Sequence, residues 1–455
     1  MPEHDKHDQQ TTTGREALDG ASAGGPAWEG PVAIVGARLI DGTGGEPIDD
    51  AMIVLDGDRI RAVGRQRDVA LPADATVIEA SGMTVLPGLI DCHVHLAGQW
   101  GYDLLRRLMT QPSLSLLYAV PNARATVEAG ITTVRDAGGT PAGVKLAIER
   151  GLFAGPRMRV AVSFLSQTGG HGDSFMPCCI DLGQSLPSDV PFGVVDGADQ
   201  MRHKVREILR AGADWIKLCT SGGVLSPADS PESAQFTIEE IAVAVYEAAA
   251  QDKRCMAHAQ SNRGIKNALE AGITSIEHGI YLDDEAIEMM LRRGVYLVPT
   301  LVAPQDVLDL AAAKPGLLPP YAIEKARQVM ATHRASFRKA VEAGVKVAMG
   351  TDSGVGPHGG NARELALMAE HGMTPMQAIV ASSRSAAELL RLDDQLGTLA
   401  AGKLADLLVV DGDPLKDVGL LAKPERLALV VKGGAAVRGR LRATKRPVAV
   451  SAPQV

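Results

Sequence analysis

The sequence predicts an α/β fold, a (β/α)8 TIM barrel that carries a small β-sandwich built from both chain ends. Three observations support this prediction. Eight short apolar runs alternate with helical patterns through the middle of the chain, and β-type runs near the N-terminus return near the C-terminus. The third is composition, because 45% of the residues are hydrophobic but only 3% aromatic, which suits the aliphatic core of a helix-covered parallel sheet. A barrel with an attached module also accounts for the length of 455 residues.

The two chain ends carry the β-sandwich signal. Residues 1–30 are polar and rich in Gly, Ser and Thr, which is typical of a flexible tail. After them come VAIVGARLI, AMIVLDGDRIRAVG and ATVIEA, and ADLLVVDGDP and LALVVKGGAAVRG follow near the C-terminus. We therefore expect residues 31–86 and 393–443 to form one composite β-sandwich, with the barrel, residues 87–392, inserted between its halves.

The barrel strands are expected at eight apolar runs: 84–93, 132–136, 157–163, 214–219, 254–258, 274–278, 295–300 and 345–352. Helix signals lie between several of them. Thr237 with Glu240 has the spacing of a capping box, and Thr374-Pro375 with Gln377 has the same spacing with an N1 proline. Asp283 can cap a helix that ends at Gly294. This punctuation places the strand ends.

Charge and cysteine content limit the partners. The formal net charge is −8 and no dense Lys/Arg cluster occurs, so nucleic acid and anionic membranes are not expected to bind. The five cysteines make no disulfide framework and no C-x-x-C pair. No apolar run is long enough to span a bilayer, and the N-terminus has no apolar signal region. We expect a cytoplasmic protein that acts on a small molecule.

The run PGLIDCHVHL is the first chemical signal, because an apolar strand ends in His93-Val94-His95. Residues i and i+2 of a strand point to the same side, so both imidazoles can converge on one metal ion. An H-x-H pair alone is weak evidence, since two histidines on the exposed side of a sheet have the same pattern. The position of further polar residues therefore decides how the pair is interpreted.

Four other ionisable residues each follow a separate predicted strand: Lys217, His258, His278 and Asp352. In a (β/α)8 barrel the C-terminal strand ends form the active-site face. Such groups are costly to bury without partners, and a shared metal site would supply those partners. Alternatives remain, because Lys217 fits an ordinary ion pair and Asp352 fits a turn or a helix N-cap.

These motifs resemble the amidohydrolase superfamily over nearly the whole chain, from about residue 32 to residue 439. PGLIDCHVHL is similar to its opening metal motif, and IKLCTSGGV, HAQS, SIEHG and GTDSG are similar to later motifs in the expected order. The nearest resemblance is to the imidazolonepropionase-related branch, which includes Xaa-Pro dipeptidases, Xaa-Arg carboxypeptidases and ochratoxin-type amide hydrolases. The runs VPTL, GMTPMQAI and GTLAAGKLADLLVVDGDPL carry that resemblance.

The resemblance implies two divalent metal ions, expected to be Zn²⁺. It makes His93, His95 and Asp352 ligands of one ion, and His258 and His278 ligands of the other. Lys217 would bridge them as an N-carboxylated lysine formed from carbon dioxide, because a carbamate beside two dications is favoured over an ammonium group. A mononuclear site stays open. Metal-activated hydroxide would attack the substrate, and Asp352 would carry the proton to the departing amine.

Three further residues are substrate-contact candidates. His171 lies in QTGGHGDSF, in a long loop after the third strand, and by resemblance it polarises the scissile carbonyl or binds substrate. Tyr281 follows His278 by three residues, and His358 follows Asp352 in GPHGGN. The alternatives are a surface loop histidine, a tyrosine packed under a loop, and a second loop histidine. We assign no chemistry to His203, His333 or His371, which lie on helical patterns.

The expected reaction is hydrolysis of an amide C–N bond in a dipeptide or an N-acyl amino acid. The alternative is a xenobiotic hydrolase that cleaves an aryl amide, carbamate or urea at the same site. Deamination fits less well, because related deaminases have a glutamate three residues after the histidine that matches His258, and Ser261 stands here. A non-catalytic scaffold is a further alternative, which the complete ligand set disfavours. By resemblance, we also expect a homo-oligomer.

Overall fold

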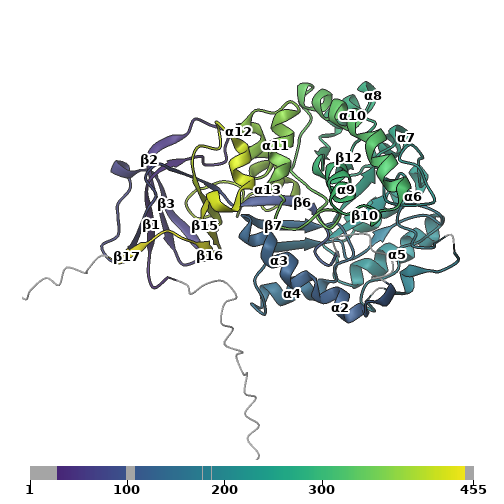
Figure 1. The fold of residues 1–455 in the computed structure, drawn as a ribbon, viewed down its shortest axis with the longest axis horizontal. Helices are drawn as coiled ribbons and strands as arrows, with labels where there is room; N and C mark the ends of the chain where they lie inside the picture. The colour runs from purple at the N-terminus through teal and green to yellow at the C-terminus, as the bar shows by residue number, and fades with distance from the viewer. Residues whose placement is uncertain (1–27, 99–107, 177, 186, 446–455) are drawn as a thin grey trace, which may run out of the picture.

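The computed structural model describes residues 28–98, 108–176, 178–185 and 187–445. Figure 1 shows a helix-covered barrel beside a smaller unit of β-strands, with helices α11, α12 and α13 between them. The predicted tail, apart from residues 28–30, lies outside the described residues. Among the described residues, no helix is both long and apolar enough to cross a membrane.

The smaller unit is a nine-stranded sheet to which both chain ends contribute, as the sequence predicts. Its central connection is between β5 and β14, which pair antiparallel from Pro87 with Leu407 to Met83 with Asp411. Alternate residues such as Ile34, Val85 and Val409 face one buried cluster. The strands are β1 (Val32–Leu39), β2 (Ile48–Asp56), β3 (Arg59–Arg65), β4 (Thr76–Glu79), β5 (Met83–Pro87), β14 (Leu407–Asp411), β15 (Leu427–Lys432), β16 (Ala435–Gly439) and β17 (Ala443–Lys445).

The regular strands of the barrel form two parallel sheets and do not close into one ladder. The first contains β6 (Leu89–Val94), β7 (Ile131–Asp136) and β8 (Arg157–Val160). The second contains β9 (Phe164–Leu165), β10 (Trp215–Cys219), β11 (Arg254–Ala259), β12 (Ser275–His278) and β13 (Tyr296–Val298). Seven of the eight predicted runs therefore contain regular strands, in the predicted order.

Two predicted strands need correction because each run is broken. The run 84–93 splits into β5 of the sandwich and β6 of the barrel at Gly88, where an added Cβ would lie 2.3 Å from Thr132 Oγ1. The run 157–163 ends as regular strand at Val160, and the chain turns at Val162, whose φ is 63°. The strand then resumes as β9, so β8 pairs with β7 while β9 pairs with β10.

The eighth predicted strand, 345–352, is extended chain with isolated bridges and not a regular strand. It still joins the two sheets. Leu297 N of β13 donates to Lys346 O over 2.8 Å, and Cys92 N of β6 donates to Met349 O over 2.8 Å. A regular ladder does not form there, since Met349 N donates to Ala381 O at the end of a helix over 2.9 Å and not to a neighbouring strand. These bonds place the end of this segment beside the end of β6.

The predicted helix signals are confirmed. Thr237 and Glu240 form a capping box at α6, Thr374 and Gln377 form one at α12, and Asp283 caps α8, which ends at Gly294. The helices are α2 (Pro112–Leu117), α3 (Ala119–Glu128), α4 (Ala142–Glu149), α5 (Ala198–Arg210), α6 (Ile238–Ala249), α7 (Asn262–Ala271), α8 (Asp284–Arg293), α9 (Val302–Ala313), α10 (Pro320–Glu342), α11 (Arg363–Glu370), α12 (Pro375–Ala381) and α13 (Arg384–Leu390).

Candidate active site

The H-x-H pair lies at the end of β6, with both rings facing the same carboxylate. His93 Nδ1 lies 2.8 Å from Glu277 Oε2, and His95 Nδ1 lies 2.8 Å from Gly138 O. A carboxylate and a carbonyl can only accept, so each ring carries its proton on Nδ1. The Nε2 atoms are 3.5 Å and 3.2 Å from Asp352 Oδ1. Both Nε2 lone pairs are thus directed to one point.

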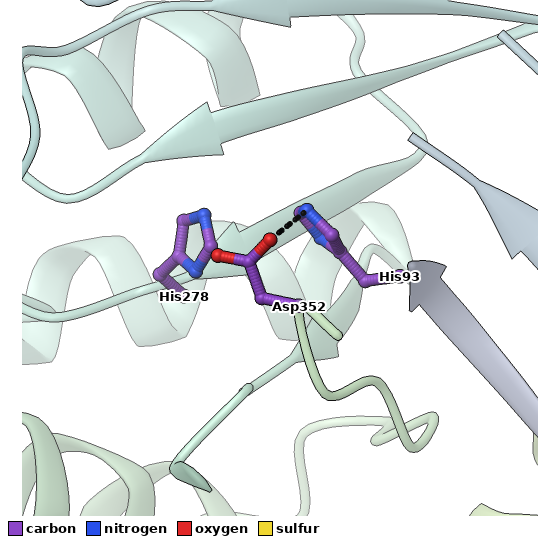
Figure 2. A group of neighbouring side chains, drawn as sticks. All are labelled: His93, His278 and Asp352. Carbon is purple, nitrogen blue, oxygen red and sulfur yellow. Dashed lines mark ion pairs between the residues drawn. The ribbon is translucent and has the colours of Figure 1, made fainter. Parts of the chain in front are cut away.

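His278 ends β12 and completes a compact donor group with His93 and Asp352. One ligand atom from each of the three lies within 4.8 Å of the others. Figure 2 shows the Asp352 carboxylate between the two imidazoles. His278 Nδ1 is 2.7 Å from Thr300 Oγ1, which leaves Nε2 free to act as a ligand.

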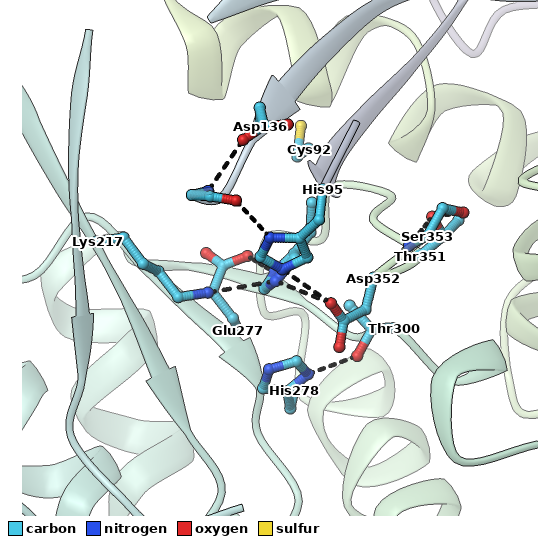
Figure 3. A network of polar contacts seen from close by, with 12 residues as sticks. Cys92, His95, Asp136, Lys217, Glu277, His278, Thr300, Thr351, Asp352 and Ser353 are labelled. Carbon is cyan, nitrogen blue, oxygen red and sulfur yellow. Dashed lines mark hydrogen bonds and ion pairs between the residues drawn. The ribbon is translucent and has the colours of Figure 1, made fainter. Parts of the chain in front are cut away.

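Lys217 and His258 extend this group. Lys217 Nζ is 3.2 Å from His93 Nε2, and Figure 3 shows the lysine reaching toward the histidines from β10. The His258 ring centroid is 4.6 Å from that of His278, and its Nε2 is 3.0 Å from Gly222 O. All six ligand candidates therefore lie in one connected cluster at the C-terminal ends of the strands.

Burial sets the charge of the cluster. Desolvation lowers the pKa of three imidazoles well below the usual range: His93, His258 and His278. It also lowers the pKa of Lys217. Burial alone would raise the pKa of Asp352, but its interactions with His93, His95 and Lys217 lower that pKa, and the contact with Asp352 raises the pKa of His95 in spite of its burial. Neutral imidazoles beside an ionised carboxylate are the protonation states that bind a divalent cation.

Three residues of the site have left-handed backbone. The φ angles are 72° at His278, 53° at Thr300 and 60° at Asp352. This region is uncommon for residues other than glycine, and such strain persists only where the surrounding contacts impose it. The two ligand candidates of the group are thus held by the fold in positions that the local sequence alone disfavours.

A buried ion pair that the sequence analysis did not identify supports His93. Glu277 Oε1 accepts from Arg135 Nη2 over 2.8 Å, while its other oxygen faces His93. Both side chains are fully buried, at 0% exposure. Arg135 also donates to Cys92 O over 2.6 Å, the residue before His93. The only sequence signal was a charged residue inside each of two apolar strands.

A second buried carboxylate, Asp91, ties β6 to the segment that bears Asp352. Asp91 Oδ2 accepts from Thr351 Oγ1 over 2.6 Å and from Asn361 Nδ2 over 2.8 Å. Burial raises the pKa of Asp91 to about 6 in spite of these hydrogen bonds. Asp91 therefore fixes the end of β6, which carries His93, relative to the extended segment that carries Asp352.

A mainly apolar pocket opens beside the cluster. His171, His258, His278 and Asp352 line it, and the rest of its wall is largely aliphatic, including Val224, Leu225, Ile280, Val307, Val329 and Val355. The His171 ring is stacked on His258 with a centroid distance of 4.0 Å. Within the described residues, neither Lys nor Arg lines this pocket. Such a wall suits an uncharged, apolar ligand.

The loop after β10 holds His171. His171 Nδ1 is 2.9 Å from Ser226 Oγ, and that hydroxyl donates to Asp229. Gly223 lies against the ring, since an added Cβ would be 2.2 Å from His171 Cε1. Lys325 Nζ donates to three carbonyls of the same loop, those of Gly223, Ser226 and Asp229. The amine of Lys325 is thus engaged in holding the loop.

The structure separates the other two substrate candidates from this pocket. Tyr281 is half-buried, and its hydroxyl lies 3.4 Å from Glu232 Oε1. His358 has both ring nitrogens in contact with protein, Nδ1 at 3.2 Å from Thr126 Oγ1 and Nε2 at 3.2 Å from His95 O. Neither side chain lines the pocket. His333, to which we assigned no chemistry, does line it.

Comparison with known proteins agrees with this arrangement. Residues 84–437 match the amidohydrolase family. The chain is 33% identical to the ochratoxinase of Aspergillus niger over 429 residues, which cover 90% of this chain and 88% of that one. The crystal structure of a Xaa-Pro dipeptidase with bound methionine is 34% identical, with a TM-score of 0.82 over 90% of this chain and 100% of that one. The crystal structure of the Aspergillus niger ochratoxinase is 32% identical, with a TM-score of 0.79 over 90% of this chain and 96% of that one.

Proposed function

The chain belongs to the amidohydrolase family and hydrolyses carbon–nitrogen amide bonds. We propose that its substrates are neutral amides with an apolar acyl or aryl group. The observation that supports this substrate class is the aliphatic pocket beside the His/Asp/Lys cluster. The ochratoxinase to which the chain is 33% identical is an amide hydrolase.

No lysine or arginine among the described residues lines this pocket, which argues against a substrate that places a free carboxylate there. Burying a carboxylate without a partner is costly, and proteins usually pair it with arginine or lysine. Lys325 of α10, a cation near the pocket, already donates to three carbonyls of the loop after β10. A dipeptide substrate is the second candidate, because the Xaa-Pro dipeptidase structure is similar over 90% of this chain.

We propose that the cluster holds two divalent ions, expected to be Zn²⁺. His93, His95 and Asp352 would hold one ion and His258 and His278 the other, with Lys217 as an N-carboxylated bridge. The fit rests on the donor set, since the Nε2 atoms of His93 and His95 both face Asp352 Oδ1, and one ligand atom each of His93, His278 and Asp352 lies within 4.8 Å of the others. When bound, the ions would acidify water and polarise the substrate carbonyl.

The side chains of the chain would then perform the remaining steps. Asp352, kept ionised by its neighbours, would accept a proton from the attacking water and deliver it to the leaving nitrogen. His171 would orient the substrate, because it lies on the pocket wall and is hydrogen-bonded to Ser226 of the loop that Lys325 holds. The aliphatic wall would exclude water from the reacting amide.

A hydrolysis screen tests the substrate class. We expect kcat/KM to be at least about tenfold higher for acetanilides and other aryl amides than for Xaa-Pro dipeptides, since an apolar contact of one or two methylenes already changes affinity by that factor. Product amines can be quantified for both sets with the same protein. Preferential cleavage of dipeptides would select the second candidate, and hydrolysis of neither set would contradict both.

Metal content and Lys217 are tested together. The purified protein should contain about two divalent ions per chain, and chelation should abolish hydrolysis until Zn²⁺ is restored. The Lys217→Arg variant keeps a cation but cannot become a carbamate bridge, so we expect it to bind at most one ion and to lose activity by about 10²-fold or more. Reconstitution of the wild type in carbon dioxide-free buffer should be slow and should be accelerated by bicarbonate. An active, fully loaded Lys217→Arg variant would contradict the bridging role.

A further inference from the structure

Two residues of the pocket wall each carry a buried polar atom with no hydrogen-bond partner among the described residues: Gln260 Oε1 and His333 Nδ1. Buried polar atoms are nearly always paired in folded proteins, because an unpaired one costs free energy. Eight such side-chain atoms occur in the described residues, and only these two belong to residues that line the pocket. A ligand in the pocket is therefore a candidate for the missing partner.

The contacts of His333 show which kind of partner it needs. Its Nε2 lies 2.8 Å from Pro299 O and 3.0 Å from His278 O. Both neighbours are carbonyl oxygens, so Nε2 must carry the ring proton. An imidazolium would bury a charge and leave its Nδ1–H unpaired. In the neutral ring Nδ1 is therefore an acceptor, on a residue that is only 2% exposed.

Gln260 presents a second acceptor. Its backbone is fixed on both sides, since Gln260 N donates to Ser221 Oγ over 2.7 Å and Gln260 O accepts from Tyr281 N over 2.9 Å. The residue is 5% exposed, and its amide oxygen has no protein donor. Two acceptors thus lie in a wall that is otherwise mostly aliphatic.

We propose that Gln260 and His333 are specificity-determining residues, which select amides whose apolar part carries a hydrogen-bond donor such as a hydroxyl group. This inference rests on the proposed function and narrows its substrate class. An aliphatic pocket alone discriminates poorly between a substrate and its hydroxylated analogue. An acceptor left unpaired by the plain analogue and paired by the hydroxylated one creates that discrimination.

The test uses phenylacetanilide and its monohydroxylated derivatives, which carry the hydroxyl group at each ring position in turn, measured with the metal-loaded enzyme. We expect at least one hydroxylated isomer to have a kcat/KM about tenfold above that of the parent, as one hydrogen bond of this kind provides. In His333→Gln the amide nitrogen can still donate to the two carbonyls but the amide oxygen no longer stands where Nδ1 stood, so the ratio should fall; in the double variant with Gln260→Met it should fall to about one. Gln260→Met, which keeps the side-chain length, should also lower it.

The matched control is His371→Gln. His371 Nε2 is likewise buried without a hydrogen-bond partner among the described residues, but the residue lies at the end of α11 and does not line the pocket. This variant should keep the wild-type ratio. Equal loss of all substrates in His333→Gln, or no preference for any hydroxylated isomer in the wild type, would overturn the inference.

A binding measurement separates this inference from the proposed function. Calorimetry can compare phenylacetate and aniline with their hydroxylated counterparts, the products of the same reactions, and needs no turnover. One hydroxylated product should bind wild type about tenfold more tightly than its parent and lose that advantage in the double variant. Absence of hydrolysis with this binding pattern would contradict the amidase proposal only, whereas hydrolysis without the pattern would contradict the role of the two acceptors.

Discussion

Replacing Asp352 with asparagine is expected to lower kcat by about 10³-fold or more while leaving the fold intact. General acid–base catalysis by one positioned side chain contributes about 10²–10⁴-fold. Asp352 lies 3.2 Å from His95 Nε2 and 3.5 Å from His93 Nε2, so asparagine keeps the shape of the contact but removes the negative charge and the proton acceptor. Steady-state kinetics on an aryl amide and thermal unfolding measure the two effects.

The roles of Asp352 as proton carrier and as proposed ligand are separated by metal content. A variant that retains both ions but has lost turnover would assign the loss to proton transfer, whereas loss of one ion would assign it to ligation. Asp309→Asn is the control, because this carboxylate is 51% exposed on α9 and pairs with Arg363. It should retain wild-type kinetics. Activity of Asp352→Asn within about tenfold of wild type would exclude the role in acid–base catalysis.

Local patterns were sufficient to predict the scaffold of the site. The apolar runs that contain four of the predicted ligands are strands: His278 is the last residue of β12, His93 and His258 lie one residue before the ends of β6 and β11, and Lys217 lies two residues before the end of β10. Helix caps such as Asp283 were equally predictable from the sequence, because a cap is a contact between residues three positions apart. A parallel barrel then brings the strand ends to one face without further information from the sequence.

Contacts between distant segments explain what the sequence could not show. The break at Val162 and the left-handed backbone of His278 and Asp352 are imposed by neighbouring strands, and no local pattern signals them. His333 reads as an ordinary residue on the buried face of a helix. Its role in the pocket depends on Pro299 O and His278 O, which belong to other parts of the chain.

Tyr281 and His358 show that a position close to a ligand in sequence does not predict a position in the pocket. Each follows a predicted ligand within a few residues, yet proximity in sequence did not place either side chain in the pocket. The chain turns sharply after His278 and Asp352, so the residues that follow are directed to other contacts. By contrast, His171 is distant in sequence from every predicted ligand, more than forty residues from Lys217, yet its ring is stacked on that of His258.

Glu277 is the clearest case of a site residue that only the three-dimensional structure reveals, and Glu277→Gln has the largest expected effect on stability. The change leaves the fully buried guanidinium of Arg135 without its counter-charge. Breaking a buried ion pair on one side typically costs about 3–5 kcal/mol, so we expect the free energy of unfolding to fall by about 3 kcal/mol. Urea unfolding of the metal-free protein measures this loss. Glu388→Gln, at an exposed pair on α13, should change the same quantity by less than about 1 kcal/mol.

The same residue should control metal affinity through His93. Glu277 Oε2 accepts from His93 Nδ1 over 2.8 Å and so keeps the lone pair of Nε2 directed at Asp352. Loss of such a supporting carboxylate typically weakens metal binding by about 10–100-fold. The double variant Glu277→Gln/Arg135→Met separates the two roles, because removing both charges should recover most of the stability but none of the metal affinity. Recovery of both together would mean that Glu277 acts on the site only through the stability of the barrel.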